Sequence, residues 1–203
     1  MKFTTLIILF STIFGFTQEI KYNLVLKDSC SGKIENAILY HLQKNGTEYQ
    51  ISDFDGTIML PNKGEYELVA TEIGELHIIS INKLINSDTL IKPTIEEYIK
   101  RTNVSFKKGA DKEELIKLGI IPNYKFIACE RTCNGIETDY YSNGATRLIA
   151  EFKNGLVIGE LKRYYQSGKI KEISIYDEGG FLTKTTLFEE SGKIKSVQNF
   201  NGL

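Results

Sequence analysis

The sequence has little of what several classes of protein require. It contains three prolines and no low-complexity segment among its 203 residues, which argues against long disordered regions. Its formal net charge is −1, and it becomes −2 without residues 1–17, in which Lys2 is the single charged residue. A chain so close to neutral lacks the basic surface with which non-specific nucleic-acid-binding proteins neutralise phosphates. We therefore expect no nucleic-acid partner.

Residues suited to catalysis or metal binding are also scarce. His41 and His77 are the two histidines, both inside predicted strands, and no nucleophile motif such as G-x-S-x-G occurs. Histidines on strands are more often structural or surface groups than catalytic ones. Asp53 and Asp55 before Gly56 resemble a calcium loop only faintly, because further oxygen ligands and a distant Glu are missing. We expect no enzyme activity, no catalytic residue, no metal and no cofactor.

The N-terminus predicts export. Lys2 is a minimal positive region, an apolar run follows it, and Gly15 and Thr17 are small residues at the −3 and −1 positions of a cleavage site before Gln18. The run is shorter than the roughly 20 apolar residues of a membrane-spanning helix, and no later segment could span a membrane. We interpret residues 1–17 as a signal peptide, with a buried element of the mature fold as the alternative. The predicted location is the periplasm, the cell envelope or the extracellular space.

Export allows a disulfide between two of the three cysteines. Cys129 and Cys133 are close in sequence and flank a predicted turn at residues 130–132, so they are the expected pair, and the odd count leaves one thiol over. A zinc site is not favoured, because one C-x3-C pair with no nearby His supplies two of the four ligands that structural zinc needs.

Residues 18–90 predict a small β-sandwich. Five to seven short strand-like runs alternate with turn signals, a spacing typical of sandwiches. The run at residues 21–27 alternates with period two, and its apolar residues on one face are Tyr22, Leu24 and Leu26. The Asn45-Gly46 pair predicts a tight hairpin.

A resemblance supports this interpretation. The segments that carry it are Gly32-Lys33-Ile34, Ala37-Ile38, Ser52-Asp53-Phe54-Asp55-Gly56-Thr57, Pro61, Gly64-Glu65-Tyr66-Glu67-Leu68 and Ile73-Gly74. Together they resemble the carboxypeptidase-regulatory-like domain, which implies a transthyretin-like sandwich with an accessory or presenting role. The family usually has an aromatic residue after the Ile-Gly pair, where this chain has Glu75.

Residues 91–133 are predicted to form a connector with short helices. Thr94 with Glu97 could form a capping box for one or two helical turns. Asp111 with Glu114 is a second candidate, and Gly119 stands where the C-cap of that helix would fall.

Residues 134–203 predict a β-meander of three 24-residue repeats. Three columns of like residues keep this spacing: Tyr140, Tyr164 and Phe188; Gly144, Gly168 and Gly192; and Phe152, Tyr176 and Phe200. Each glycine lies in a tight turn, where it supplies a positive φ. The strands between the turns are about eight residues long, a normal length for a meander.

The repeat pattern resembles a known family. The motif Tyr-Tyr-x-x-Gly-x7-Phe-x-x-Gly-x3-Gly, as it stands from Tyr140 to Gly159, is similar to MORN-repeat variants. The second copy departs from it with Thr183 in place of the last glycine. Some members are labelled antitoxins of toxin–antitoxin systems, which implies binding and neutralising a protein partner.

A cationic row is the candidate binding feature. Arg147, Lys171 and Lys195 share the 24-residue step and should line one face of the sheet, where an acidic partner could bind them together with Tyr140 and Tyr164. The alternative is an ordinary solvated face, because residues 134–203 hold nine cations and nine acids.

The sequence therefore predicts a mostly β protein: a small sandwich, a partly helical connector and a MORN-like meander. The function it favours is an exported, non-catalytic protein-interaction module, antitoxin- or immunity-like, whose oligomeric state the sequence leaves open. The alternatives are a structural envelope protein without a dedicated ligand and an enzyme that uses His41 or His77 in a cleft.

Overall fold

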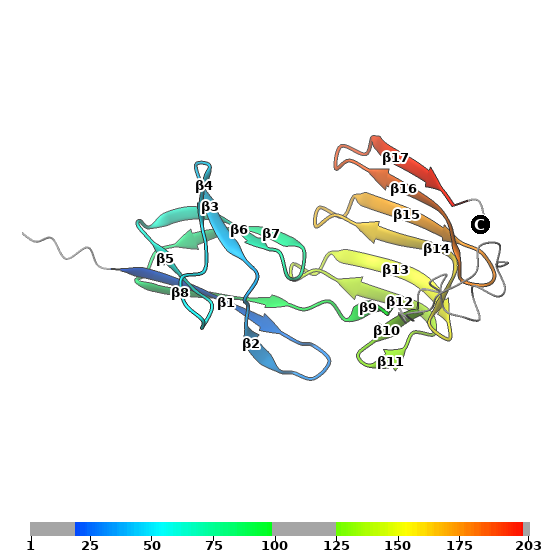
Figure 1. Ribbon diagram of the computed structural model, residues 1–203, viewed down its shortest axis with the longest axis horizontal. Helices are drawn as coiled ribbons and strands as arrows, with labels where there is room; N and C mark the ends of the chain where they lie inside the picture. The colour runs from blue at the N-terminus through cyan, green and yellow to red at the C-terminus, as the bar shows by residue number, and fades with distance from the viewer. Residues whose placement is uncertain (1–18, 99–124, 201–203) are drawn as a thin grey trace, which may run out of the picture.

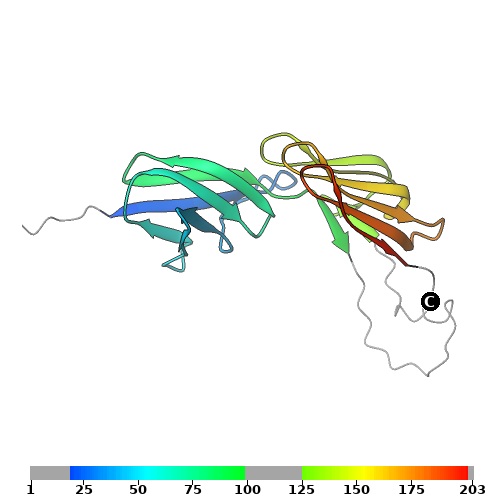
Figure 2. The same ribbon diagram turned by 90° about the horizontal axis from the view of Figure 1, so that it is seen from above.

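The computed structural model describes residues 19–98 and 125–200, which fold into β-sheets grouped in two lobes (Figure 1). Seen from above, the lobes lie end to end (Figure 2). These residues contain no helix, and almost all of the strand pairs are antiparallel, so the mostly β fold class is confirmed. The predicted signal peptide and the helix predicted from Asp111 lie outside the described residues.

The N-terminal lobe contains two four-stranded sheets. One sheet consists of β1 (Ile20–Lys27), β2 (Ile34–Asn36), β5 (Thr57–Leu60) and β8 (Ile85–Ile91). The other consists of β3 (His41–Lys44), β4 (Thr47–Tyr49), β6 (Gly64–Ala70) and β7 (Glu75–Ile81). β8 runs parallel to β1, and every other pair in this lobe is antiparallel.

The core of this lobe follows from the alternation in β1. Tyr22, Leu24 and Leu26 are fully buried, as period two predicts, and they form one apolar cluster with Leu42 and Leu68 of the other sheet. The predicted hairpin is also present: Asn45 and Gly46 both have positive φ and join β3 to β4 through a two-residue turn. The same cluster therefore holds both sheets together.

A three-stranded sheet follows, where short helices are predicted. It contains β9 (Ile95–Tyr98), β10 (Lys125–Ala128) and β11 (Arg131–Thr132), with β10 in the middle. The capping box predicted at Thr94 and Glu97 is therefore wrong. Glu97 pairs with Phe126 in the sheet, and Ile95 is buried in the core beneath it. Local capping signals are weak, and here pairing with β10 outweighs them.

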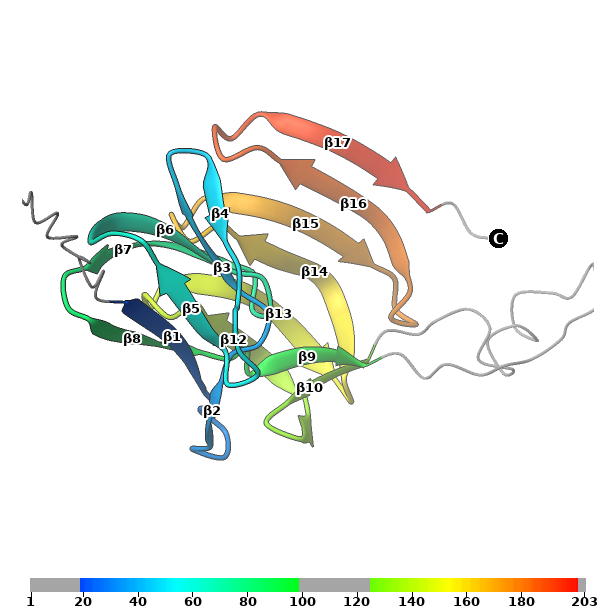
Figure 3. The same ribbon diagram turned by 60° about the vertical axis from the view of Figure 1, so that its left-hand side comes forward.

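The C-terminal lobe is a six-stranded antiparallel sheet in which each strand pairs with the next (Figure 3). Its strands are β12 (Gly135–Tyr140), β13 (Thr146–Lys153), β14 (Leu156–Tyr164), β15 (Ile170–Tyr176), β16 (Leu182–Phe188) and β17 (Ile194–Asn199). The small β9–β11 sheet covers one face of it. Phe126 from β10 packs against Phe152 from β13, with ring centroids 5.3 Å apart, inside a core that extends to Tyr176 on β15.

Four turns of this sheet share one backbone geometry, three of them at the end near the N-terminal lobe and the fourth, at 177–181, at the opposite end (Figure 1). In the first, the amide of Tyr141 donates to the carbonyl of Ala145, and the amide of Gly144 donates back to the carbonyl of Tyr141. The same pair of bonds recurs in the turns at 165–169, 177–181 and 189–193. Each has a glycine at the fourth position with a φ between +77° and +89°, a conformation that glycine adopts without steric cost. A β-bulge follows each turn.

Candidate functional site

The two lobes meet at a junction formed by the start of β7 and the first turns of the six-stranded sheet. Three residues, 92–94, connect β8 to β9. The amide of Leu76 donates to Gln166 Oε1 at 2.9 Å, and the amide of Ile91 donates to Ser142 Oγ at 2.8 Å. These contacts join residues 51 to 90 positions apart, so the junction belongs to the tertiary fold and not to local chain connectivity.

Two buried carboxylates and one largely buried arginine meet at the junction. Arg147 Nε donates to Asp139 Oδ2 at 2.9 Å, and its Nη1 is 3.8 Å from Oε1 of Glu75 in the other lobe. Glu75 is 2% exposed and Asp139 is 3% exposed. The amide and hydroxyl of Thr94 also donate to Asp139, and the amide of Ser142 donates to Glu75. Buried carboxylates need such partners, because an unpaired charge is costly away from water.

Arg147 thus has a structural role that the predicted cationic row did not foresee. Its side chain is 12% exposed and its guanidinium lies 5.3 Å from the centre of the Tyr141 ring. Placing Arg147 in an exposed partner-binding row is therefore a wrong prediction. The physical reason is the approach of the N-terminal lobe, whose Glu75 covers this end of the sheet.

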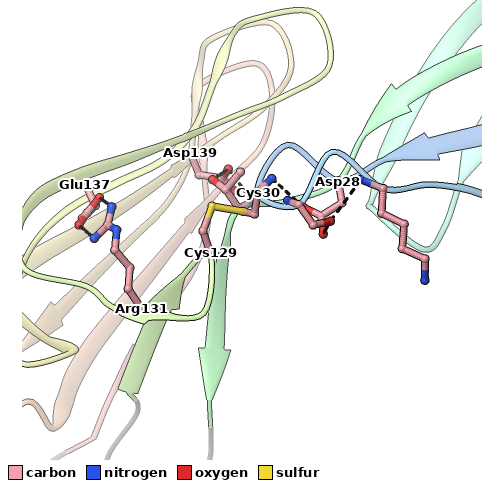
Figure 4. The surroundings of a disulfide bond; sticks show 9 residues. Asp28, Cys30, Cys129, Arg131, Glu137 and Asp139 are labelled. Carbon is pink, nitrogen blue, oxygen red and sulfur yellow. Dashed lines mark hydrogen bonds and ion pairs between the residues drawn. A yellow bond between two sulfur atoms is a disulfide. The ribbon is translucent and has the colours of Figure 1, made fainter.

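A disulfide joins the same two lobes (Figure 4). It links Cys30 to Cys129, with Cα atoms 5.1 Å apart. Cys30 lies in an exposed turn whose amides donate to the Asp28 carboxylate, and the Ser31 hydroxyl does the same. These hydrogen bonds, the one from Ser31 foremost, lower the pKa of Asp28. Cys129 is at the tip of the β10–β11 hairpin.

The expected Cys129–Cys133 pair is therefore wrong. Cys129 and Glu130 are the two central residues of the hairpin, both with positive φ, whereas Cys133 lies beyond β11 and its amide donates to the carbonyl of Phe126. Cys133 is at the far end of the hairpin, about 10 Å from the tip along the strand. It is the free cysteine and is fully buried, and burial raises the pKa of its thiol to about 11.

A cavity of about 300 Å³ lies beside the ion cluster, lined by residues of both lobes. Ile73 comes from the β6–β7 turn, and Tyr164 and Lys171 come from the six-stranded sheet. Arg163 also lines it and bridges Glu172 at 2.7 Å and Glu97 at 3.4 Å. The charges in this cavity are thus largely compensated within the chain, which argues against a strong preference for an anionic ligand.

The two histidines lie apart from this cavity. His77 Nε2 is 2.8 Å from Glu75 Oε2 and belongs to the buried junction. His41 borders a smaller cavity of about 230 Å³, and its Nε2 is 3.2 Å from Glu48. In the described part of the chain, no hydrogen bond joins either histidine to a hydroxyl or thiol that could act as a nucleophile.

The remaining predicted binding residues do not form one patch. Lys171 and Lys195 are both exposed and are separated by β16, a distance of about 10 Å across the sheet. Tyr140 is 52% exposed on the first strand, about 24 Å from Lys195 on the last. Tyr164 is half-buried at the cavity between the lobes.

A second set of tyrosines carries contacts that the sequence analysis missed. Tyr141 donates its hydroxyl hydrogen to the carbonyl of Tyr164 at 2.6 Å, and Tyr165 donates to Phe188 at 2.7 Å. Each bond spans 23 residues, so it ties one 24-residue segment to the next. Lys171 Nζ lies 5.7 Å from the Tyr165 ring, as Arg147 lies over Tyr141. The sequence could have indicated these contacts, because Tyr141 and Tyr165 are also 24 residues apart and each follows a tyrosine of the repeat.

The side chains of the six-stranded sheet become more exposed from β13 to β17. On β13, three side chains are buried in the core beneath β9–β11, namely Leu148, Ala150 and Phe152. Every residue of β16 is only partly buried, and every residue of β17 is exposed. Among the described residues, the core beneath the β9–β11 sheet extends to β15, with Leu182 of β16 packed at its border, and β17 forms the edge of the six-stranded sheet (Figure 3).

Comparison of the chain with protein-family models, with curated proteins and with solved structures finds no match. Within residues 19–98 and 125–200, no helix is long and apolar enough to cross a membrane. The same residues contain no group of three or more His, Cys, Asp or Glu side chains that could hold a metal ion.

Proposed function

We propose that this chain is an exported, non-catalytic protein-interaction module that presents the open half of its six-stranded sheet to a protein partner. The observation that carries the proposal is the contrast between the two halves of that sheet. In the described part of the chain, β13 and β14 are covered by the β9–β11 sheet, whereas β17 contributes no residue to the core and exposes Ile194 and Val197, followed by the exposed Phe200. Exposed apolar residues grouped on neighbouring positions are typical of interaction surfaces.

The junction supports a presenting role for the N-terminal lobe. Two independent links hold the lobes together, the Cys30–Cys129 disulfide and the buried Glu75–Arg147–Asp139 cluster. A sheet attached in this way offers its open half in a defined direction. In the finer form of the proposal, the N-terminal lobe is a transthyretin-like sandwich and the six-stranded sheet is a MORN-like meander.

The disulfide also supports the proposed location. Disulfides persist in oxidising compartments and are rare in a reducing cytosol. Together with the signal peptide predicted at residues 1–17, the Cys30–Cys129 bond favours the periplasm, the envelope or the extracellular space. A partner in that compartment makes an immunity-like role more suitable than that of a cytoplasmic antitoxin.

The test is a crosslinking pull-down from the native envelope fraction with the oxidised chain from Gln18 onward. The test variant is Lys171→Glu/Lys195→Glu, which reverses both exposed cations of the repeat row. The matched control is Lys63→Glu/Lys83→Glu, which makes the same charge change on exposed lysines of the other lobe. One stoichiometric partner that the control retains and the test variant loses would support the proposal. No partner above background would refute it.

A structural envelope protein without a dedicated ligand is the second candidate. It is favoured by the internal contacts of the repeat cations, because Arg147 is buried in the junction and Lys171 lies over the Tyr165 ring. If the pull-down finds no partner, cell fractionation of a strain that lacks this protein should show altered envelope integrity. Unchanged integrity would count against this second role.

A further inference from the structure

The cavity between the lobes contains buried hydrogen-bond donors that the chain leaves without an acceptor. Arg147 lines this cavity and donates from Nε to Asp139. Within residues 19–98 and 125–200, its buried Nη1 and Nη2 atoms have no hydrogen-bond partner. Glu75 Oε1 is 3.8 Å from Nη1, which is too far for a hydrogen bond. Because a buried donor without an acceptor is unfavourable, an acceptor atom from outside the chain would stabilise this site.

Much of the remaining wall is apolar, and the space suits a molecule with one ring. Ile73 lines the cavity from the N-terminal lobe, and three apolar residues line it from the sheets of the other lobe, namely Ile95, Phe126 and Leu148. An apolar cavity of about 150 Å³ can hold benzene. The cavity of about 300 Å³ therefore has room for one such ring together with a polar group.

The charges on the wall favour a neutral molecule. The Asp139 carboxylate already pairs with Arg147 at 2.9 Å. Glu97 pairs with Arg163 at 3.4 Å, and burial is the main reason that the pKa of Glu97 is raised, so this wall does not favour a further anion. A cation is not favoured either, because Lys171 also lines the cavity and pairs with no carboxylate in the described part of the chain. A carbonyl oxygen accepts hydrogen bonds without adding charge.

We propose that this cavity binds a small neutral organic molecule, with a carbonyl oxygen that accepts from Arg147 and a ring-sized apolar body that packs against Ile73 and Phe126. An aromatic or acyl amide has this chemistry. The site goes beyond the proposed function, because it requires no protein partner and lies away from β17. Since residues of both lobes line the cavity, a bound molecule would contact both and stabilise the folded chain.

The first experiment uses three probes of nearly the same shape: benzamide, benzoate and benzamidine. They share one ring and a planar head group, and the head groups are neutral, anionic and cationic. Backbone amide chemical shifts of the oxidised chain from Gln18 onward are followed during titration. Benzamide should shift the amides of Gly74, Ile95 and Lys171, which line the cavity. It should bind about tenfold more tightly than benzoate, and benzamidine, which has no acceptor, should bind least.

The second experiment changes the cavity wall. Arg147→Lys keeps a cation near Asp139 but lacks the forked donors, so it should weaken benzamide binding about tenfold. Because Arg147 also holds the junction, Gly74→Asn is a second variant. Gly74 has a φ of +68°, which Asn tolerates, and an added Cβ there meets no atom within 4 Å, so Asn adds volume at the wall. Gly46→Asn is the matched control, at a left-handed φ of the β3–β4 turn, and should leave binding unchanged. Urea unfolding checks the fold of each variant.

Each other outcome would overturn the proposal. If no probe shifts the lining amides at about 20 mM, water alone satisfies the Arg147 donors and the cavity is not a site for such molecules. Equal binding of benzoate or benzamidine would contradict the choice of a neutral acceptor. Shifts confined to the smaller cavity beside His41 would place binding elsewhere. Benzamide binding that survives both Arg147→Lys and Gly74→Asn would show that these residues do not form the site.

Discussion

Replacing Arg147 by Ala should destabilise the protein far more than the same change at Lys195, although both residues occupy the same position of the 24-residue pattern. Arg147→Ala leaves Asp139 buried without its cation and removes the guanidinium beside Glu75, which keeps His77 as a neighbour. Removing one partner of a buried ion pair typically costs about 3 to 5 kcal/mol. Lys195 is exposed on β17, where a substitution typically changes stability by about 0.5 kcal/mol or less.

The assay is urea unfolding of the oxidised chain at neutral pH, with the free energies of unfolding of both variants compared with that of the wild type. A double variant adds a second criterion. Arg147→Ala/Glu75→Gln should be more stable than the sum of the two single effects predicts, by about 1 to 3 kcal/mol, because the second change removes one of the unpaired charges. If Arg147→Ala costs no more than Lys195→Ala, the buried cluster does not hold the lobes and the reasoning fails.

Three further predictions follow from the described contacts. Peptide mapping without reduction should recover Cys30 linked to Cys129, and reducing this bond should lower the free energy of unfolding by about 2 to 4 kcal/mol; a different linkage would contradict the structure. Tyr165→Phe should cost about 1 kcal/mol in thermal unfolding by removing its hydroxyl bond, whereas Tyr140→Phe at an exposed ring should cost nearly nothing. At about pH 8 the buried Cys133 thiol, whose pKa is raised to about 11, should react with a thiol reagent only after unfolding; rapid reaction of the native chain would contradict its burial.

Local patterns in the sequence predicted the elements that depend on neighbouring residues. The apolar residues of the period-two run at residues 21–27 form the buried face of β1. The Asn45-Gly46 pair forms the two-residue turn of the β3–β4 hairpin. The turn glycines Gly144, Gly168 and Gly192 all have the left-handed φ that their turns require. Such features follow from the stereochemistry of a few adjacent residues, so the sequence suffices to place them.

Long-range pairings decided what local patterns could not. Cys30 bonds to a cysteine 99 positions away, because the β10–β11 hairpin directs Cys129 toward the turn at Asp28. Thr94 lies beside a strand and not in a helix cap, because Asp139 accepts its amide and hydroxyl and β10 pairs with the following residues.

The sequence alone determined the alternation of β1, the turn glycines of the repeats and the 24-residue spacing of Arg147, Lys171 and Lys195. Only the tertiary structure decided that these three equivalent positions differ. Arg147 is buried by Glu75 of the other lobe, Lys171 borders the cavity between the lobes, and Lys195 is exposed on the last strand. The physical reason is that a repeated sequence specifies a local conformation, whereas burial and charge pairing depend on which part of the chain packs against each copy.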